Sequence, residues 1–217
     1  MFKTTDILKP SEAAVVAQVT LRDVNRVIDE RILPEDLFTI DDGRHVRAAA
    51  CFLIAFYFET ATRLTAEERT FTIMEAGSRL HDLRTLPLTA LLEENWKVRD
   101  DFLVIDLLPF VRRTKEGLDR LAAAREMVET HPDMLGGMPV IHGTRIPVYD
   151  VAASLMSGIP ADRILAAYPT LAAETLELVK IYVEANPLRG RPRSVSGLPK
   201  EAVILDDRKV PRRRKAR

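Results

Sequence analysis

The first 47 residues place two short helical segments directly before a hairpin, and this order constrains the fold more than any other feature. Ser11 can cap a helix over residues 11–17, and Thr20 can cap a second helix over residues 21–31. Residues 38–47 predict two strands joined by Asp42-Gly43, because Asp-Gly is favoured in two-residue turns that need positive φ. The second helix has one apolar face, formed by Leu21, Val24, Val27 and Ile28.

Two helices, a tight turn and a hairpin are the layout of a winged helix-turn-helix, and this segment resembles the MerR-like form of that fold. The resemblance implies that the second helix reads DNA, because a helix fits the major groove and its polar side chains reach base edges. The hairpin tip, with Arg44, His45 and nearby Arg47, can contact the backbone or the minor groove. The candidate DNA-binding residues are Arg22, Asn25, Arg26, Arg44, His45 and Arg47. The alternative is a solvated helix face on which Arg22 and Arg26 have Asp23 and Asp29 as salt partners.

Residues 1–10 are expected to form an arm, and further elements are predicted between residues 46 and 129. They are a long apolar helix over 46–63, a helix capped by Thr65 that runs to about residue 80, a strand over 102–107, and an amphipathic helix over roughly 110–129. The longest apolar run, residues 48–58, has about half of the roughly 20 residues that a membrane helix needs. The first residues contain no apolar segment of the signal-peptide type. We therefore expect no membrane partner and a cytoplasmic location.

His131-Pro132 opens a separate C-terminal unit, in which glycines and prolines mark the turns. The run GGMPVIHGTRIPV covers residues 136–148, and Thr170 is predicted to cap the last of three short helices that follow. These helices are predicted over about 149–157, 160–167 and 171–185. Arg145 is expected to be a scaffold residue, with a buried or half-buried guanidinium that ties loop carbonyls together. The residues assigned to this structural motif are Gly137, Pro139, Gly143, Thr144, Arg145 and Pro147.

This motif, followed by GIPADRILAAYPTL over residues 158–171, resembles a small domain of formerly unknown function. The domain occurs in bacterial antitoxins of the VapB type and in proteins encoded beside PIN-like ribonuclease toxins. The resemblance covers about residues 128–187, and ANPLRGRPR over residues 185–193 is similar to larger members with an N-terminal DNA-binding unit. It implies a helical bundle related to helix-turn-helix folds, a complex with a cognate toxin, and autoregulation of the operon.

The charge of the chain sums to zero but is divided unevenly. Residues 187–217 contain 11 Lys and Arg against three acids, a net of +8, so residues 1–186 carry −8. A PIN-like ribonuclease holds divalent metal in a carboxylate cluster, and arginine pairs bidentately with carboxylates. We therefore expect Arg189, Arg191 and Arg193 to bind the toxin from a flexible tail. The alternatives are a tail that binds a polyanion such as DNA, a tail that folds back on the acidic body, and a solvated tail that only keeps the chain soluble.

No motif in the sequence indicates catalysis or cofactor binding. The four histidines lack a metal-binding spacing such as H-E-x-x-H, and there is no Walker-type loop, dinucleotide fingerprint or nucleophile elbow. The one cysteine, Cys51, lies in an apolar helix and excludes an intramolecular disulfide and a multi-cysteine zinc site. We therefore expect that the protein is not an enzyme, that it has no catalytic residue, and that it binds no metal or cofactor.

The predicted fold is mainly α with small β hairpins, with an N-terminal winged helix-turn-helix and a C-terminal trihelical domain like a helix-turn-helix. The predicted regions are a DNA-binding region at 1–84, a connecting strand and helix at 85–127, an antitoxin domain at 128–187 and a basic tail at 188–217. The expected function is that of a type II antitoxin, which neutralises a PIN-like ribonuclease and, as a homodimer, represses its own operon on operator DNA. Two alternatives stay open. One is a stand-alone winged-helix transcriptional regulator without a toxin, and the other is an interaction adaptor that no longer reads DNA.

Overall fold

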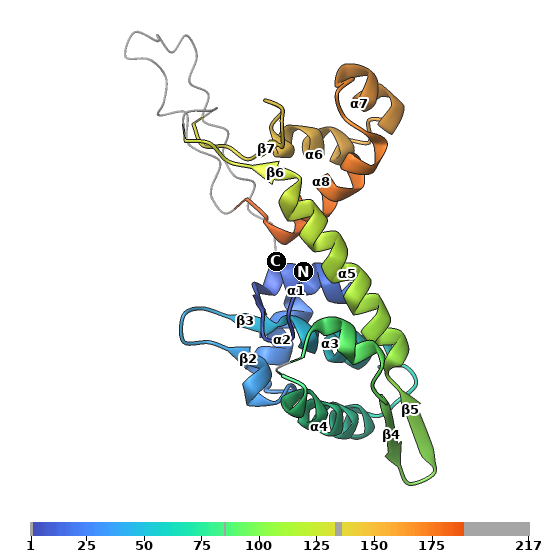
Figure 1. Cartoon of the computed structure of the whole chain (residues 1–217). Helices are drawn as coiled ribbons and strands as arrows, with labels where there is room; N and C mark the ends of the chain where they lie inside the picture. The colour runs from blue at the N-terminus through green and yellow to red at the C-terminus, as the bar shows by residue number, and fades with distance from the viewer. Residues whose placement is uncertain (1, 85, 133–135, 189–217) are drawn as a thin grey trace, which may run out of the picture. The chain divides into compact units, whose positions relative to one another are not determined.

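The computed structural model describes residues 2–84, 86–132 and 136–188, and these residues form a mainly helical fold with three small antiparallel sheets (Figure 1). The predicted fold class, mainly α with small β hairpins, is confirmed. The α-helices are α1 (Pro10–Ala17), α2 (Leu21–Asp29), α3 (Cys51–Glu59), α4 (Ala66–Asp82), α5 (Leu108–Glu126), α6 (Val148–Met156), α7 (Ala161–Ala167) and α8 (Ala173–Ala185). The strands are β1 (Ile7–Leu8), β2 (Phe38–Thr39), β3 (His45–Arg47), β4 (Lys97–Asp100), β5 (Leu103–Asp106), β6 (Val128–Glu129) and β7 (Val140–Ile141). The short 3₁₀ helices are η1 (Glu35–Leu37), η2 (Ala48–Ala50) and η3 (Leu88–Leu92).

The N-terminal residues belong to the fold rather than to an arm, because β1 pairs antiparallel with β3 and completes a sheet in the order β1-β3-β2. The N-cap of α1 is Lys9, so the prediction that Ser11 is the cap is wrong. Ser11 is buried inside the helix, and its hydroxyl donates a hydrogen bond of 2.6 Å to the carbonyl of Ala185, the last residue of α8. A polar residue that favours helix starts therefore serves here as a tertiary contact.

Helix α2 begins at the predicted residue. The Thr20 side chain accepts a hydrogen bond of 3.2 Å from the backbone N–H of Asp23, and the Asp23 carboxylate accepts one of 3.0 Å from the N–H of Thr20. The hairpin after it differs from its prediction, because Thr39 pairs with His45 and leaves residues 40–44 as the loop. The two-residue Asp42-Gly43 turn is wrong, and within this loop only Gly43 has a positive φ, of 92°.

The middle of the chain contains shorter elements than the sequence predicts. The apolar helix expected over residues 46–63 divides into η2 and α3, which ends at Glu59. Helix α4 is capped by Thr65 as predicted, and Glu68 completes a reciprocal capping box. The strand predicted over residues 102–107 is β5, and it forms a hairpin with β4, which the sequence analysis did not identify.

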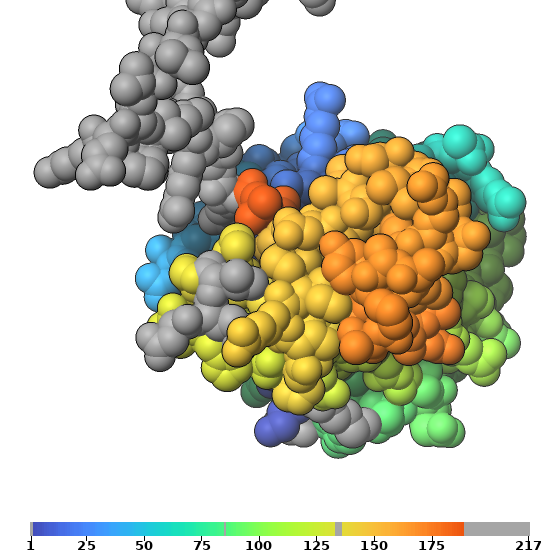
Figure 2. Space-filling model, turned by 90° about the horizontal axis from the view of Figure 1, so that it is seen from above, coloured from blue at the N-terminus to red at the C-terminus, as the bar shows by residue number. Residues whose placement is uncertain are grey.

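Two clusters of buried apolar side chains organise the described residues. The larger is built mainly from α1 to α5 and contains Phe52, Phe56 and Trp96, whereas the smaller lies among β7, α6, α7 and α8. Helix α5 contacts α1 and α3 and also α8, so one helix packs against elements of both clusters. Figure 2 shows the atoms of α6 to α8, in yellow-orange to orange, gathered into one contiguous mass. The predicted Thr170 cap is wrong, since the N-cap of α8 is Ala172.

Among residues 2–84, 86–132 and 136–188, none of the helices combines the length and the apolar character needed to cross a lipid bilayer.

Candidate functional site

The outward face of α2 carries three of the predicted DNA-binding residues. Val24, Val27 and Ile28 are buried, so helical periodicity turns the positions between them away from the core. Arg22 and Arg26 are exposed, and Asn25 is half-buried beside them. The helix therefore presents two guanidinium groups and one amide on the side opposite its apolar face.

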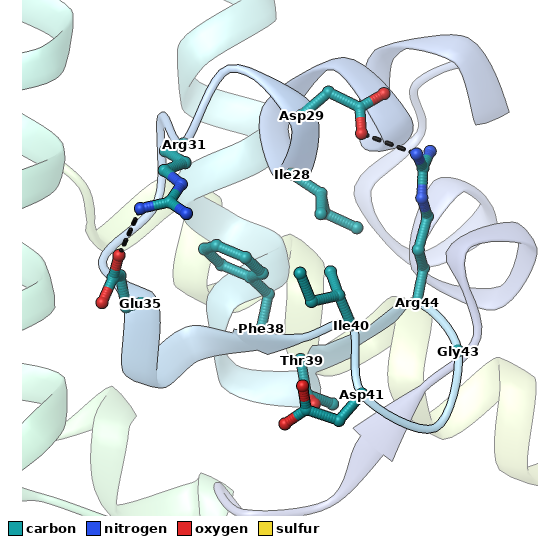
Figure 3. A pocket seen from close by; sticks show the side chains of 10 residues that line it. All are labelled: Ile28, Asp29, Arg31, Glu35, Phe38, Thr39, Ile40, Asp41, Gly43 and Arg44. Atoms are coloured by element: carbon teal, nitrogen blue, oxygen red, sulfur yellow. Dashed lines mark hydrogen bonds and ion pairs between the residues drawn. The ribbon is translucent and has the colours of Figure 1, made fainter.

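Arg44 extends from the hairpin loop to α2 and contacts it at two positions. Its guanidinium donates a hydrogen bond of 2.9 Å to Oδ1 of Asn25. It also forms an ion pair of 2.7 Å with Oδ1 of Asp29, which Figure 3 shows. The other end of the Asn25 amide is also engaged, because Nδ2 donates a hydrogen bond of 2.9 Å to the carbonyl of Leu21. The structure thus brings Asn25 and Arg44 together, although 19 residues separate them in the sequence.

The remaining candidates differ in how they are engaged. Arg26 forms an ion pair of 2.9 Å with Glu30, and this hydrogen bond and the charge of Glu30 raise the pKa of Arg26. Arg22 makes no hydrogen bond or ion pair with another described residue. His45 and Arg47 are half-buried on β3, and Nδ1 of His45 lies 3.2 Å from the carbonyl of Gly43.

The acids on this face have other partners than the sequence analysis expected. Asp23 is engaged in the helix cap, and Asp29 pairs with Arg44 rather than with Arg22 or Arg26. Glu30, which pairs with Arg26, was not identified from the sequence. The spacing of Arg26 and Glu30, four residues on one helix, is the signal that would have found it.

A surface pocket of about 570 Å³ lies between the C-terminal end of α2 and the hairpin (Figure 3). Ile28, Phe38 and Ile40 supply its apolar lining. The Asp29–Arg44 ion pair lies on one side, and an ion pair of 2.8 Å between Arg31 and Glu35 lies on the other. Opposite charges therefore neutralise each other locally along this surface.

The C-terminal motif builds the turn between β7 and α6. The Thr144 hydroxyl donates a hydrogen bond of 2.7 Å to the carbonyl of Ile141 and accepts one of 3.1 Å from the N–H of Ile146. Gly143 has a φ of 71°, which favours glycine. The carbonyl of Pro139 accepts a hydrogen bond from the N–H of Val148, and Pro147 bridges to Val140. Gly137 also has a positive φ.

Arg145 differs from its expected position. It is exposed, and its guanidinium makes no hydrogen bond with any residue that the structure describes. The carbonyls of the turn are instead bound by backbone N–H groups and by Thr144, which leaves no need for a guanidinium.

Glu129, at the end of β6, collects contacts that the sequence analysis did not anticipate. Its Oε2 lies 3.4 Å from Nε2 of His131 and 3.1 Å from Nδ1 of His142, and its Oε1 accepts a hydrogen bond of 3.1 Å from the N–H of Gly143. Burial raises the pKa of Glu129, but the hydrogen bonds and the two histidine charges outweigh burial, so the net shift of its pKa is downward. Through its contacts with His142 and Gly143, Glu129 links β6 to the turn after β7.

Other chemically reactive groups offer no second site within the described part of the chain. Burial raises the pKa of the Cys51 thiol to about 12, so the thiol is protonated at neutral pH. No group of three or more histidine, cysteine, aspartate or glutamate side chains among the described residues could hold a metal ion. Arg189, Arg191 and Arg193, the predicted toxin-binding residues, lie outside the described residues.

Comparisons with known proteins show what this chain is similar to. Residues 128–183 match the family model described as "Protein of unknown function (DUF433)", which falls within the C-terminal unit that the motif predicts. No solved structure matches the chain significantly. The chain is 60% identical over 210 residues to "Uncharacterized protein y4eO" of Sinorhizobium fredii (strain NBRC 101917 / NGR234), covering 97% of this chain and 95% of that relative. Because so high an identity extends over nearly the whole of both chains, this protein belongs to the same family as y4eO.

Proposed function

We propose that this protein is a DNA-binding antitoxin that represses its own operon and neutralises a PIN-like ribonuclease. One observation carries the DNA-binding part. The buried face of α2 leaves Arg22, Asn25 and Arg26 directed outward, next to a hairpin whose Arg44 contacts the same helix surface. A helix that presents such side chains beside a hairpin arginine suits the major groove and the adjacent backbone.

The charge distribution of this face favours DNA binding that depends on sequence. The cations of this face are balanced by Asp29 and Glu30, so the surface has little net charge with which to hold DNA of any sequence. Base contacts or dimerisation would then supply much of the affinity, because neutralised phosphates alone provide most non-specific binding. We propose a homodimer that contacts two half-sites.

The antitoxin part of the proposal is supported by the C-terminal domain. Its motif resembles that of antitoxins encoded beside PIN-like ribonucleases, and its residues 128–183 match DUF433. The three arginines at 189, 191 and 193 have the side-chain chemistry to enter a metal-binding carboxylate cluster.

A mobility-shift titration tests DNA binding. The full chain is titrated against a duplex taken from upstream of its own gene and against a shuffled duplex, at 50 and 200 mM salt. Arg22→Ala is expected to weaken binding to the upstream duplex by roughly 5- to 150-fold, the range for loss of one base contact. Arg112→Ala, at an exposed arginine of α5, is the control and should leave binding unchanged. Equal effects of the two variants would refute the assignment of α2.

Co-expression tests the antitoxin part. The full chain is co-purified with the product of the adjacent gene, and the ribonuclease activity of that product is measured with and without it. Inhibition by the full chain and its loss on truncation after Leu188 are expected. Inhibition that survives truncation would remove the three arginines from the mechanism. If the product of the adjacent gene is neither bound nor inhibited, the antitoxin part is refuted and the stand-alone transcriptional regulator becomes the favoured alternative.

A further inference from the structure

We propose that Asp29 competes with DNA for Arg44, and that Arg44 in turn competes with a base for the side-chain oxygen of Asn25. This inference rests on the proposed DNA-binding function and assigns the regulation of that surface. It makes Asp29 a positioning residue, which acts on DNA through the guanidinium that it holds.

The contacts of Asn25 carry the first step. An asparagine that reads adenine uses both ends of its amide, since Oδ1 accepts from N6 and Nδ2 donates to N7. Here Oδ1 accepts from Arg44 at 2.9 Å, and Nδ2 donates to the carbonyl of Leu21 at 2.9 Å. An amide oxygen has two acceptor positions and Arg44 occupies one of them, so Arg44 competes with a base for Asn25.

The exposure of the ion pair carries the second step. The Arg44 and Asp29 side chains are 44% and 53% exposed, so water can compete for both groups. Exposed pairs of this kind are weak, whereas a phosphate offers a guanidinium a strong bidentate partner. A DNA phosphate placed next to the hairpin can therefore take Arg44 from Asp29 and Asn25 together.

The consequence is a coupling between backbone contact and base reading. When Arg44 leaves α2 for a phosphate, it frees the acceptor position that it occupied on the Asn25 oxygen. Asp29 opposes this exchange by the same amount for every DNA sequence, because it stabilises the arrangement without DNA. A duplex with a matching base offsets this cost through Asn25, whereas a duplex without one does not.

The chain offers a matched control on the other side of the same pocket. Glu35 pairs with Arg31 at 2.8 Å, with side chains 77% and 71% exposed, and neither residue contacts Asn25. Glu35→Gln removes the same charge as Asp29→Asn from the same surface. A general electrostatic effect would therefore appear in both variants, whereas competition for Arg44 would appear only in Asp29→Asn.

The experiment is a double-mutant cycle on DNA binding by the full chain. The affinities of wild type, Asp29→Asn, Arg44→Met and the double variant are measured at 100 mM salt for the upstream and shuffled duplexes. Asp29→Asn is expected to bind both duplexes about two- to fivefold more tightly and by a similar factor, because the same ion pair is lost in both complexes. In the Arg44→Met background the gain should fall to that of Glu35→Gln. Fluorescence of Trp96 during thermal unfolding shows whether each variant is folded.

The outcomes separate this inference from the proposed function. If wild type shifts neither duplex even at 50 mM salt, the proposed function fails and this inference fails with it. If wild type binds but Asp29→Asn equals Glu35→Gln, DNA binding stands and the competition by Asp29 is refuted. A gain that persists without Arg44 also refutes it, because Asp29 would then act through its charge alone.

Discussion

Gly117 of α5 lies where this helix passes closest to α1, and replacing it with alanine tests that approach. A Cβ at position 117 would lie 2.9 Å from the carbonyl oxygen of Val16 and 3.3 Å from its Cα. Both are backbone atoms of α1, so no side chain can rotate to make room. The two helices would have to separate by a few tenths of an ångström.

The sign of the change in unfolding free energy caused by Gly117→Ala shows whether packing or helix propensity dominates at this position. Alanine stabilises the interior of a helix by about 1 kcal/mol relative to glycine. Insertion of a carbon into a well-packed contact costs about 1–3 kcal/mol. We therefore expect Gly117→Ala to lower the free energy of unfolding by about 1 kcal/mol, and the melting temperature by about 2–4 °C for a chain of this size.

Urea unfolding followed by fluorescence measures this change. Trp96 is the one tryptophan of the chain and is 1% exposed in the cluster that also contains Val16 and Leu118, so its emission reports on this core. Ala122→Gly, on the same helix, calibrates the propensity contribution and should cost about 1 kcal/mol. A Gly117→Ala variant that is about 1 kcal/mol more stable than wild type would refute the close approach of α5 to α1.

Four further outcomes are expected. Thr20→Ala removes the N-cap of α2 and should cost about 1 kcal/mol of stability in urea unfolding, with weaker DNA binding as the functional readout. Ser11→Ala leaves the buried carbonyl of Ala185 unpaired and should cost about 1–3 kcal/mol by the same measurement. Because the pKa of Glu129 is lowered, its carboxylate stabilises the fold above the unfolded pKa of about 4.5. This stabilisation is lost as the pH falls through the lower pKa of the folded state. The difference in unfolding free energy between wild type and Glu129→Gln should therefore vanish in acid titrations below that pH range. Cys51 should react with a thiol reagent only when the core opens, at a rate that rises with urea concentration.

Helix starts could be predicted where the capping contacts are local. Thr20 and Thr65 each form a capping box with an acid three residues later, and both helices begin as the sequence indicates. Ser11 and Thr170 have alanine three residues later instead of an acid, and neither caps a helix. The Ser11 hydroxyl is taken by Ala185, 174 residues away, and no local pattern records such a contact.

Short strands could be predicted where an apolar run, as in β5, or a turn, as between β2 and β3, marks them. The β2–β3 hairpin has a glycine with positive φ in its loop, whereas β1 has two residues and pairs with β3 across the whole of α1 and α2. A strand of that length has no readable alternation, and its pairing is decided by packing that the sequence does not display.

In the candidate site, too, local features could be predicted from the sequence and contacts between distant residues could not. The outward direction of Arg22 and Arg26 follows from the period of the buried positions of α2. The link from Arg44 to Asn25 and Asp29 depends on how the five-residue loop folds over the helix, and the predicted two-residue turn gave no basis for it.

Helix α1 shows why the DNA-binding candidates and the DUF433 domain should be studied in one chain. Ser11 donates to the end of α8, Glu12 forms an ion pair of 2.9 Å with Arg125 of α5, and Val16 meets Gly117 of α5. Only residues 18–20 connect α1 to α2, so the contacts that fix α1 also limit how α2 can turn. A fragment that ends before α8 would lose the Ala185 acceptor and leave the Ser11 hydroxyl without its buried partner, at a cost of about 1–3 kcal/mol. Weak DNA binding by such a fragment would therefore reflect a displaced α2 as readily as a missing base contact.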